Sequence, residues 1–190
     1  MHGLVICALA RFFLETYGAA TWQQIRGRAD VGDERYEPFL KYPDDLAARV
    51  VSAAGHVLRR HPEDVWEDFG AALIASDAFT APRRLLRFSG ASFGDFLSAL
   101  PELSGRINLA VPDFFLPIVT LTEQDVGTFM FRCPDSAEYE HVLRGVIRAM
   151  ADEYGALALI DHGPDGHGVQ VQLIDVSFAS GRAFALGRVG

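Results

Sequence analysis

Apolar residues recur at helical spacing through most of the first 110 residues. The spacing predicts a first helix from Leu4 that ends near Gly18, where glycine suits a left-handed turn. A short second helix follows with Thr21 at its N-cap. Two further apolar stripes predict helices over residues 46–58 and 62–74.

A last helical stretch begins after Ser92, which suits the N-cap position. Pro101 removes a backbone donor, so we expect a kink or the start of a second, shorter helix there. Ser104 lies on or beside the apolar stripe of this stretch and leaves space in it. The stripe consists of Phe93, Phe96, Leu97, Leu100, Leu103 and Ile107.

After Pro112 the period changes from helical to two. Residues 118–122 and 128–133 predict an antiparallel hairpin, and a long helix follows over about 136–154. A second hairpin is predicted from 156–161 and 169–178. The chain is therefore predicted to be α+β. Its parts are a helical portion over about 1–110, a β-containing portion over 111–178 and a tail over 179–190.

Composition and charge narrow the possible functions. The 190 residues are 49% hydrophobic and 22% charged, with a formal net charge of -8. An acidic chain is unsuited to bind nucleic acid or an anionic membrane. The N-terminus lacks a signal-peptide pattern, and no segment approaches the length of a membrane span. Cys7 and Cys133 are predicted to be buried, reduced thiols of a cytoplasmic protein.

Four motifs occur in one register along the helical portion. They are M-H-G-L-V at 1–5, Y-G-A-A-T-W-Q-Q-I at 17–25, Y-P-D-D at 42–45 and E-D-V-W-E-D-F-G at 63–70. In order and spacing they resemble the haem-nitric oxide/oxygen binding (H-NOX) family, and the resemblance extends over residues 1–178. It implies a helical and a β-containing subdomain that clasp one b-type haem. Such a domain senses a diatomic gas and signals to a cyclase or kinase.

The resemblance also places the residues that would hold haem. The family's axial histidine occurs in a pattern like L-x-x-L-H-x-R-V, and this chain has L-P-E-L-S-G-R-I, with Ser104 in the histidine's place. A serine hydroxyl is a poor ligand for haem iron. The family's propionate clamp, Y-x-S-x-R, corresponds to F-R-C-P-D. Phe131, Cys133 and Asp135 therefore replace the tyrosine, serine and arginine, and a carboxylate repels propionates.

Because ligand and clamp are both altered, haem is predicted to be absent or weakly bound. The leading hypothesis is a non-enzymatic H-NOX-like sensory domain. Its pocket takes another apolar small molecule or is closed by side chains such as Phe93, Phe96 and Phe131. The sequence ends without a cyclase or kinase segment, so we expect the signal to pass to a separate protein.

Two other hypotheses remain open. The first is a working haem sensor of NO or O2 that uses a non-standard ligand, His141, Cys7 or Cys133, or holds the porphyrin by non-covalent burial alone. The second is a small hydrolase. Its only support is scattered Ser, His and Asp residues, without a nucleophile-elbow motif. The sequence D-H-G-P-D-G-H at 161–167 contains metal-ligand residue types, but its glycines and proline predict a plain hairpin tip.

Overall fold

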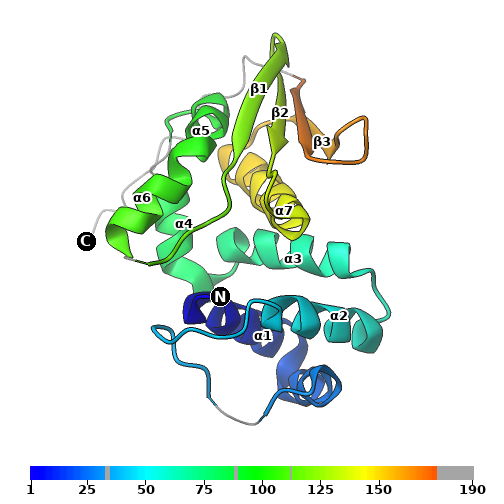
Figure 1. Ribbon diagram of the computed structural model, residues 1–190. Helices are drawn as coiled ribbons and strands as arrows, with labels where there is room; N and C mark the ends of the chain where they lie inside the picture. Colours follow the sequence, from blue (N-terminus) through cyan, green and yellow to red (C-terminus); the bar gives the residue numbers. More distant parts are fainter. Residues whose placement is uncertain (33–34, 88–89, 112, 175–190) are drawn as a thin grey trace, which may run out of the picture.

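The computed structural model describes residues 1–32, 35–87, 90–111 and 113–174 and confirms the predicted α+β class. Figure 1 shows a helical portion and a sheet portion, with the N-terminus in the helical one. The helices are α1 (Gly3–Ala29), α2 (Leu46–Leu58), α3 (Pro62–Ala75), η1 (Asp77–Phe79), α4 (Thr80–Arg87), α5 (Phe93–Ala99), η2 (Leu100–Glu102), α6 (Leu103–Ala110) and α7 (Ala137–Tyr154).

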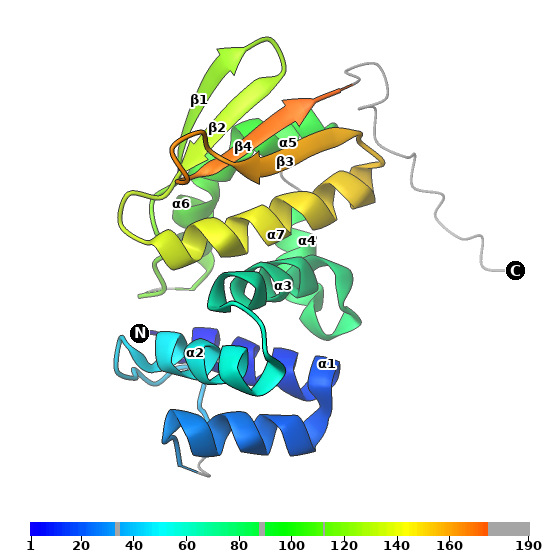
Figure 2. The same cartoon turned by 90° about the vertical axis from the view of Figure 1, so that its right-hand side faces the viewer.

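One antiparallel sheet contains four strands in the order β1-β2-β4-β3. The strands are β1 (Thr120–Asp125), β2 (Thr128–Arg132), β3 (Ala158–His162) and β4 (Val169–Leu173). Figures 1 and 2 show α7 lying across one face of this sheet, α3 on the far side of α7, and α1 with α2 beyond α3. The layers bury one apolar core that runs through both portions.

The breaks that proline and glycine predict are confirmed. Gly18 has a φ of 80°, and it divides α1 into two helical segments. Thr21 lies inside the second segment, so its predicted N-cap role was wrong. Ser92 caps α5 in a reciprocal hydrogen-bonded pair with Asp95. Pro101 lies in η2, the 3₁₀ turn between α5 and α6.

Strand boundaries differ more from the prediction. β1 begins at Thr120, two residues later than expected, and Ile118 is exposed. In β4, Val169 and Val171 are buried as the alternation predicts. Residues 175–178 of the predicted last strand, and the tail, fall outside the described residues.

α1 is long enough and apolar enough to cross a membrane. The expectation that no segment approaches a membrane span was therefore wrong in terms of length and composition. The break at Gly18 leaves pieces over 3–17 and 19–29, each shorter than the ~20 residues that a span needs. α1 also packs on α2 and α3, with Ile6, Leu9 and Phe13 buried. These contacts give α1 a place in the core.

The contact between α3 and α7 is unusually close, because each helix presents a glycine to the other. A Cβ at Gly70 of α3 would overlap the carbonyl oxygen of Val142, and a Cβ at Gly145 of α7 would overlap that of Glu67. The two backbones therefore approach as near as glycine permits. This contact fixes α7, and with it the sheet, onto the helical portion.

We predict that Gly70→Ala or Gly145→Ala lowers the free energy of unfolding by about 2–3 kcal/mol, because the added methyl group overpacks a backbone contact. Urea unfolding followed by circular dichroism measures the change. Gly27→Ala is the matched control, since Gly27 lies in helix α1 with nothing within 4 Å of an added Cβ. It should raise stability by about 0.5–1 kcal/mol. Equal effects at the three positions would contradict the close contact.

Candidate functional site

Ser104 lies in the first turn of α6 and is half-buried. Its hydroxyl donates a hydrogen bond to the carbonyl oxygen of Leu116, 3.0 Å away, in the segment that leads into β1. The bond fastens α6 to the chain that follows it. The hydroxyl of Ser104 is therefore engaged in a structural hydrogen bond.

Asn108 follows Ser104 by one helical turn, so both side chains project from the same side of α6. Its amide nitrogen Nδ2 is buried and finds no hydrogen-bond acceptor among the described residues. A buried donor without a partner is costly, by about 1–3 kcal/mol. The inner side of α6 thus combines apolar residues with one unsatisfied amide group. Sequence reasoning missed Asn108, although its spacing from Ser104 could have identified it.

The clamp positions follow one another at the end of β2. Phe131 is fully buried and Cys133 nearly so, whereas Asp135 is exposed. Burial, and to a smaller extent the carboxylate of Glu140, together raise the pKa of the Cys133 thiol from 9.0 to about 12. Cys133 is therefore a neutral thiol at ordinary pH, and it would have to lose its proton to bind a metal. Arg132 pairs at the surface with Asp165, 2.8 Å away.

Glu140 of α7 holds the backbone beside these positions. Its two carboxylate oxygens accept hydrogen bonds from the backbone nitrogens of Cys133, at 3.0 Å, and Gly168, at 2.7 Å. The carboxylate thus joins the end of β2 to the residue before β4. Glu140 thus places a second carboxylate, besides that of Asp135, near the clamp positions. Sequence reasoning missed this residue, because its partners are backbone groups distant in the chain.

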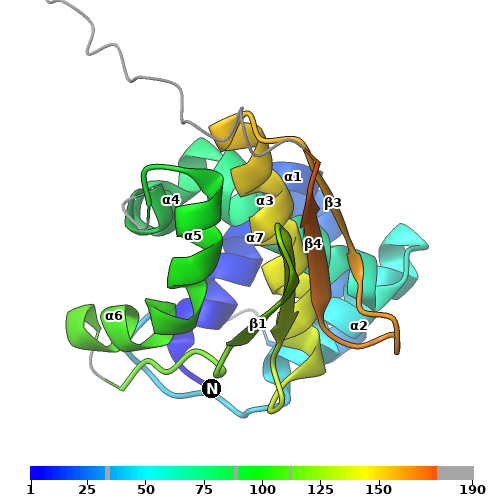
Figure 3. The same ribbon diagram turned by 90° about the horizontal axis from the view of Figure 1, so that it is seen from above.

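His141 belongs to a different cluster. Its ring lies edge-on to that of His162 in β3, with centroids 5.8 Å apart. Burial lowers its pKa, and among nearby charges Arg144 and His162 lower it while Glu63 and Glu140 oppose them. Figures 1 and 3 show α6 and β3 on opposite sides of α7. The structure therefore groups His141 with His162 and does not bring it to Ser104.

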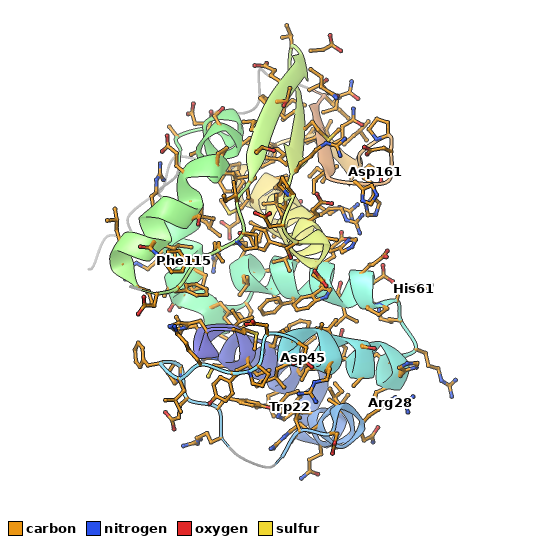
Figure 4. All side chains as sticks on the ribbon, viewed as in Figure 1. Trp22, Arg28, Asp45, His61, Phe115 and Asp161 are labelled. Carbon is orange, nitrogen blue, oxygen red and sulfur yellow. The ribbon has the colours of Figure 1, made fainter. Side chains whose placement is uncertain are left out.

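Figure 4 gives the same picture. Phe115, which precedes Leu116, lies on the side of α6, and Asp161, which precedes His162, lies on the far side of the sheet portion. Asp161 and His162 end β3, and the residues after them form the turn to β4, as the glycines and proline predict. No cluster of three or more metal-binding side chains occurs among the described residues.

Arg144 connects three elements from a buried position. Only 6% of the residue is exposed, and its Nε donates to Glu67 of α3 at 2.6 Å. Its guanidinium also contacts the ring nitrogen of His162. Arg148, one turn on, pairs with the same Glu67 and donates to the Ile160 carbonyl at 3.0 Å. This network, which sequence reasoning missed, ties α3, α7 and β3 together. The sequence signal that could have revealed the network was an arginine at an inward-facing position of α7.

We predict that Glu67→Gln lowers the free energy of unfolding by about 3 kcal/mol, because it leaves the Arg144 charge buried without its carboxylate. Glu102→Gln removes one carboxylate from an exposed pair with Arg106 and should cost less than about 1 kcal/mol. Urea unfolding of both variants checks the difference. Equal losses would show that the Glu67–Arg144 pair is no more buried than a surface pair.

A second prediction concerns the Cys133 thiol. It is protonated in the folded protein up to a pKa of about 12 but ionises near 9.0 once unfolded, so it stabilises the fold below pH 9. That contribution is lost as pH rises from 9 to 12. The difference in unfolding free energy between Cys7→Ser and Cys7→Ser/Cys133→Ala should shrink over this range. A difference that stays constant with pH would contradict the assigned pKa.

Comparisons with known proteins agree with this fold. The family model described as Haem-NO-binding matches residues 2–162. The chain is 22% identical over 154 residues to soluble guanylate cyclase gcy-31 of Caenorhabditis elegans, covering 80% of the chain and 22% of that protein. It is 18% identical over 157 residues to soluble guanylate cyclase 89Db of Drosophila melanogaster, covering 82% and 24%. The chain thus spans less than a quarter of these relatives.

Solved structures give the same result. An H-NOX protein from S. oneidensis in the Fe(II) ligation state superimposes with a TM-score of 0.75 at 15% identity, covering 92% of this chain and 97% of that one. An Fe(II) unliganded H-NOX protein from K. algicida superimposes with a TM-score of 0.71 at 14% identity, covering 94% and 99%. At such identities the likeness concerns the fold.

Proposed function

The chain belongs to the haem-NO-binding family of sensor domains, and we propose that this member keeps the fold but has lost the standard attachment of haem. One observation carries the proposal. Ser104, at the family's axial-ligand position, directs its hydroxyl to the Leu116 carbonyl oxygen. A serine hydroxyl is a poor iron ligand, and this one already has a partner within the protein.

The charges near the clamp positions support the proposal. Haem propionates are anionic and need cations or hydrogen-bond donors. Here Asp135 is a carboxylate, and Glu140 occupies two nearby backbone donors. Arg132 is engaged with Asp165 at the surface. The residues present therefore do not fit the propionate end of a haem.

Packing also supports it. Phe93, Phe96 and Phe131, the side chains that we expected to close the pocket, are fully buried in the core. Phe93 and Phe96 stack with centroids 5.9 Å apart, and both lie near Tyr154. Tyr154 in turn donates to the carbonyl oxygen of Gly90 at 2.8 Å. A packed aromatic cluster of this kind occupies volume between α5 and α7.

The proposed domain is a non-enzymatic sensor over residues 1–178. Its ligand, if small, is apolar with one hydrogen-bond acceptor, because the buried amide of Asn108 offers a donor on the inner side of α6. Its output passes to a separate signalling protein of the cyclase or kinase type in the cytoplasm. The match to soluble guanylate cyclases supports that output.

The alternative is a haem sensor with a substitute ligand. His141 packs against His162 of β3, and Cys133 would have to lose its proton to bind iron, so neither side chain is arranged for a haem beside α6. The family match is what favours the alternative. A haem titration separates the two functions.

We predict that purified wild-type protein titrated with hemin takes up no stoichiometric haem and develops no Soret band of defined ligation. Ser104→His combined with Asp135→Arg supplies an imidazole and a cation, so this variant should bind haem more tightly than wild type. Absorption spectra of the ferric and ferrous forms report the ligation.

Ser104→Ala is the matched control, because it removes the hydroxyl without adding a ligand and should bind no more haem than wild type. A defined Soret band in wild-type protein at one haem per chain would overturn the proposal. The spectrum of His141→Ala would then show whether His141 is the ligand.

A further inference from the structure

Five large apolar side chains are exposed near the N-terminus. They come from the loop before α2, and from the end of α6 with the chain that leads into β1. Figures 1 and 3 show these two segments side by side at the N-terminus, and Figure 4 shows Phe115 on this side of the molecule. The side chains, here called the apolar patch, are Phe39, Leu40, Leu109, Phe115 and Ile118.

The first residues of the chain hold the two segments together. The backbone of His2 pairs with that of Lys41, which follows Leu40. The ring of His2 packs on that of Phe114, with centroids 5.2 Å apart. The backbone nitrogen of Gly3 donates to the carbonyl oxygen of Leu40 at 2.8 Å. The two halves of the apolar patch are therefore fixed next to each other.

The apolar patch is large for the surface of a monomer. Phe39 is 81% exposed, Leu109 88% and Phe115 70%. The five side chains together expose about 600 Å², the upper end of what the largest apolar patch of a monomer usually reaches. A standard protein interface buries about 800 Å² on each partner, its polar rim included. The apolar patch is thus large enough to form the core of such an interface.

The charges favour a second copy of this chain as the partner. The net charge of -8 repels copies over most of the surface, but no side chain of the apolar patch is charged, so copies can meet there. Lys41 lies on the Leu40 side of His2, and Asp113 lies on the Phe114 side. Both are exposed, and neither side chain forms an ion pair or hydrogen bond with the described residues. In a two-fold pairing the two sides exchange, so Lys41 of each copy faces Asp113 of the partner subunit.

We propose that the apolar patch is the interface of a two-fold symmetric homodimer. Phe39, Leu109 and Phe115 of the two copies pack at its centre, and Lys41 and Asp113 pair at its rim. The rim pairs set the orientation and add little affinity, because exposed ion pairs stabilise weakly. With about 600 Å² of apolar surface on each copy, we expect a dissociation constant in the micromolar range.

Sedimentation equilibrium of the purified full chain, from about 1 to about 200 µM, tests the proposal. The mass should rise from one chain to two and no further, because a two-fold interface closes on itself. Phe115→Glu places a carboxylate from each copy in the apolar centre and should raise the dissociation constant about tenfold or more. Val126→Glu is the matched control, since Val126 is 96% exposed in the turn between β1 and β2, outside the apolar patch. It changes net charge equally and should leave the dissociation constant within about twofold.

The rim pairs test the orientation of the copies. Lys41→Glu sets like charges against each other and should raise the dissociation constant about threefold or more. Lys41→Glu/Asp113→Asn removes one of the two like charges and should recover most of that loss. Asparagine suits this position, where φ is 65°. Circular dichroism checks that each variant is folded.

Three results would overturn the proposal. The first is a chain that stays monomeric at about 200 µM, which would leave the apolar patch to a different protein. The second is equal weakening of the dimer by Phe115→Glu and Val126→Glu. The third is a double variant Lys41→Glu/Asp113→Asn that recovers none of the affinity lost in Lys41→Glu.

Discussion

The close contact between α3 and α7 determines how the two portions of the molecule are joined. Gly70 and Gly145 remove the side chains that would separate the helices, and each backbone then lies against a carbonyl of the other. Glu67 reaches Arg144 across this contact, and Arg144 continues to His162 in the sheet. A movement of the sheet relative to α3 must therefore break a buried ion pair or a backbone contact. We therefore expect α3, α7 and the sheet to move together as one rigid unit.

Side chains at and beside the proposed haem positions have partners within the protein that stabilise the fold. Ser104 fastens α6 to Leu116, and Glu140 fastens the end of β2 to Gly168. These hydrogen bonds lie entirely within the protein, and they fit the proposal that this fold is stable without haem.

The sequence predicted the elements whose signals are local. Gly18, Ser92, Pro101 and Gly155 act through their own backbone, so the breaks and caps at these positions followed from residue type. The unpaired Asn108 amide and the bonds of Ser104 and Glu140 depend on partners elsewhere in space, and no periodicity predicts such pairs. His141 was expected near the haem position because its helix faces the pocket in the family. Its ring instead faces β3, since residues on one helix can face opposite sides.

The most direct measurement is the haem content of the protein as cells make it, with the haem precursor δ-aminolevulinic acid supplied in excess. Alkaline pyridine converts any bound b-type haem to a haemochrome whose absorbance gives the number of haems per chain. The proposed loss of ligation predicts far less than one haem per chain, with a protein that is folded and unfolds cooperatively. One haem per chain, retained through gel filtration, would contradict it.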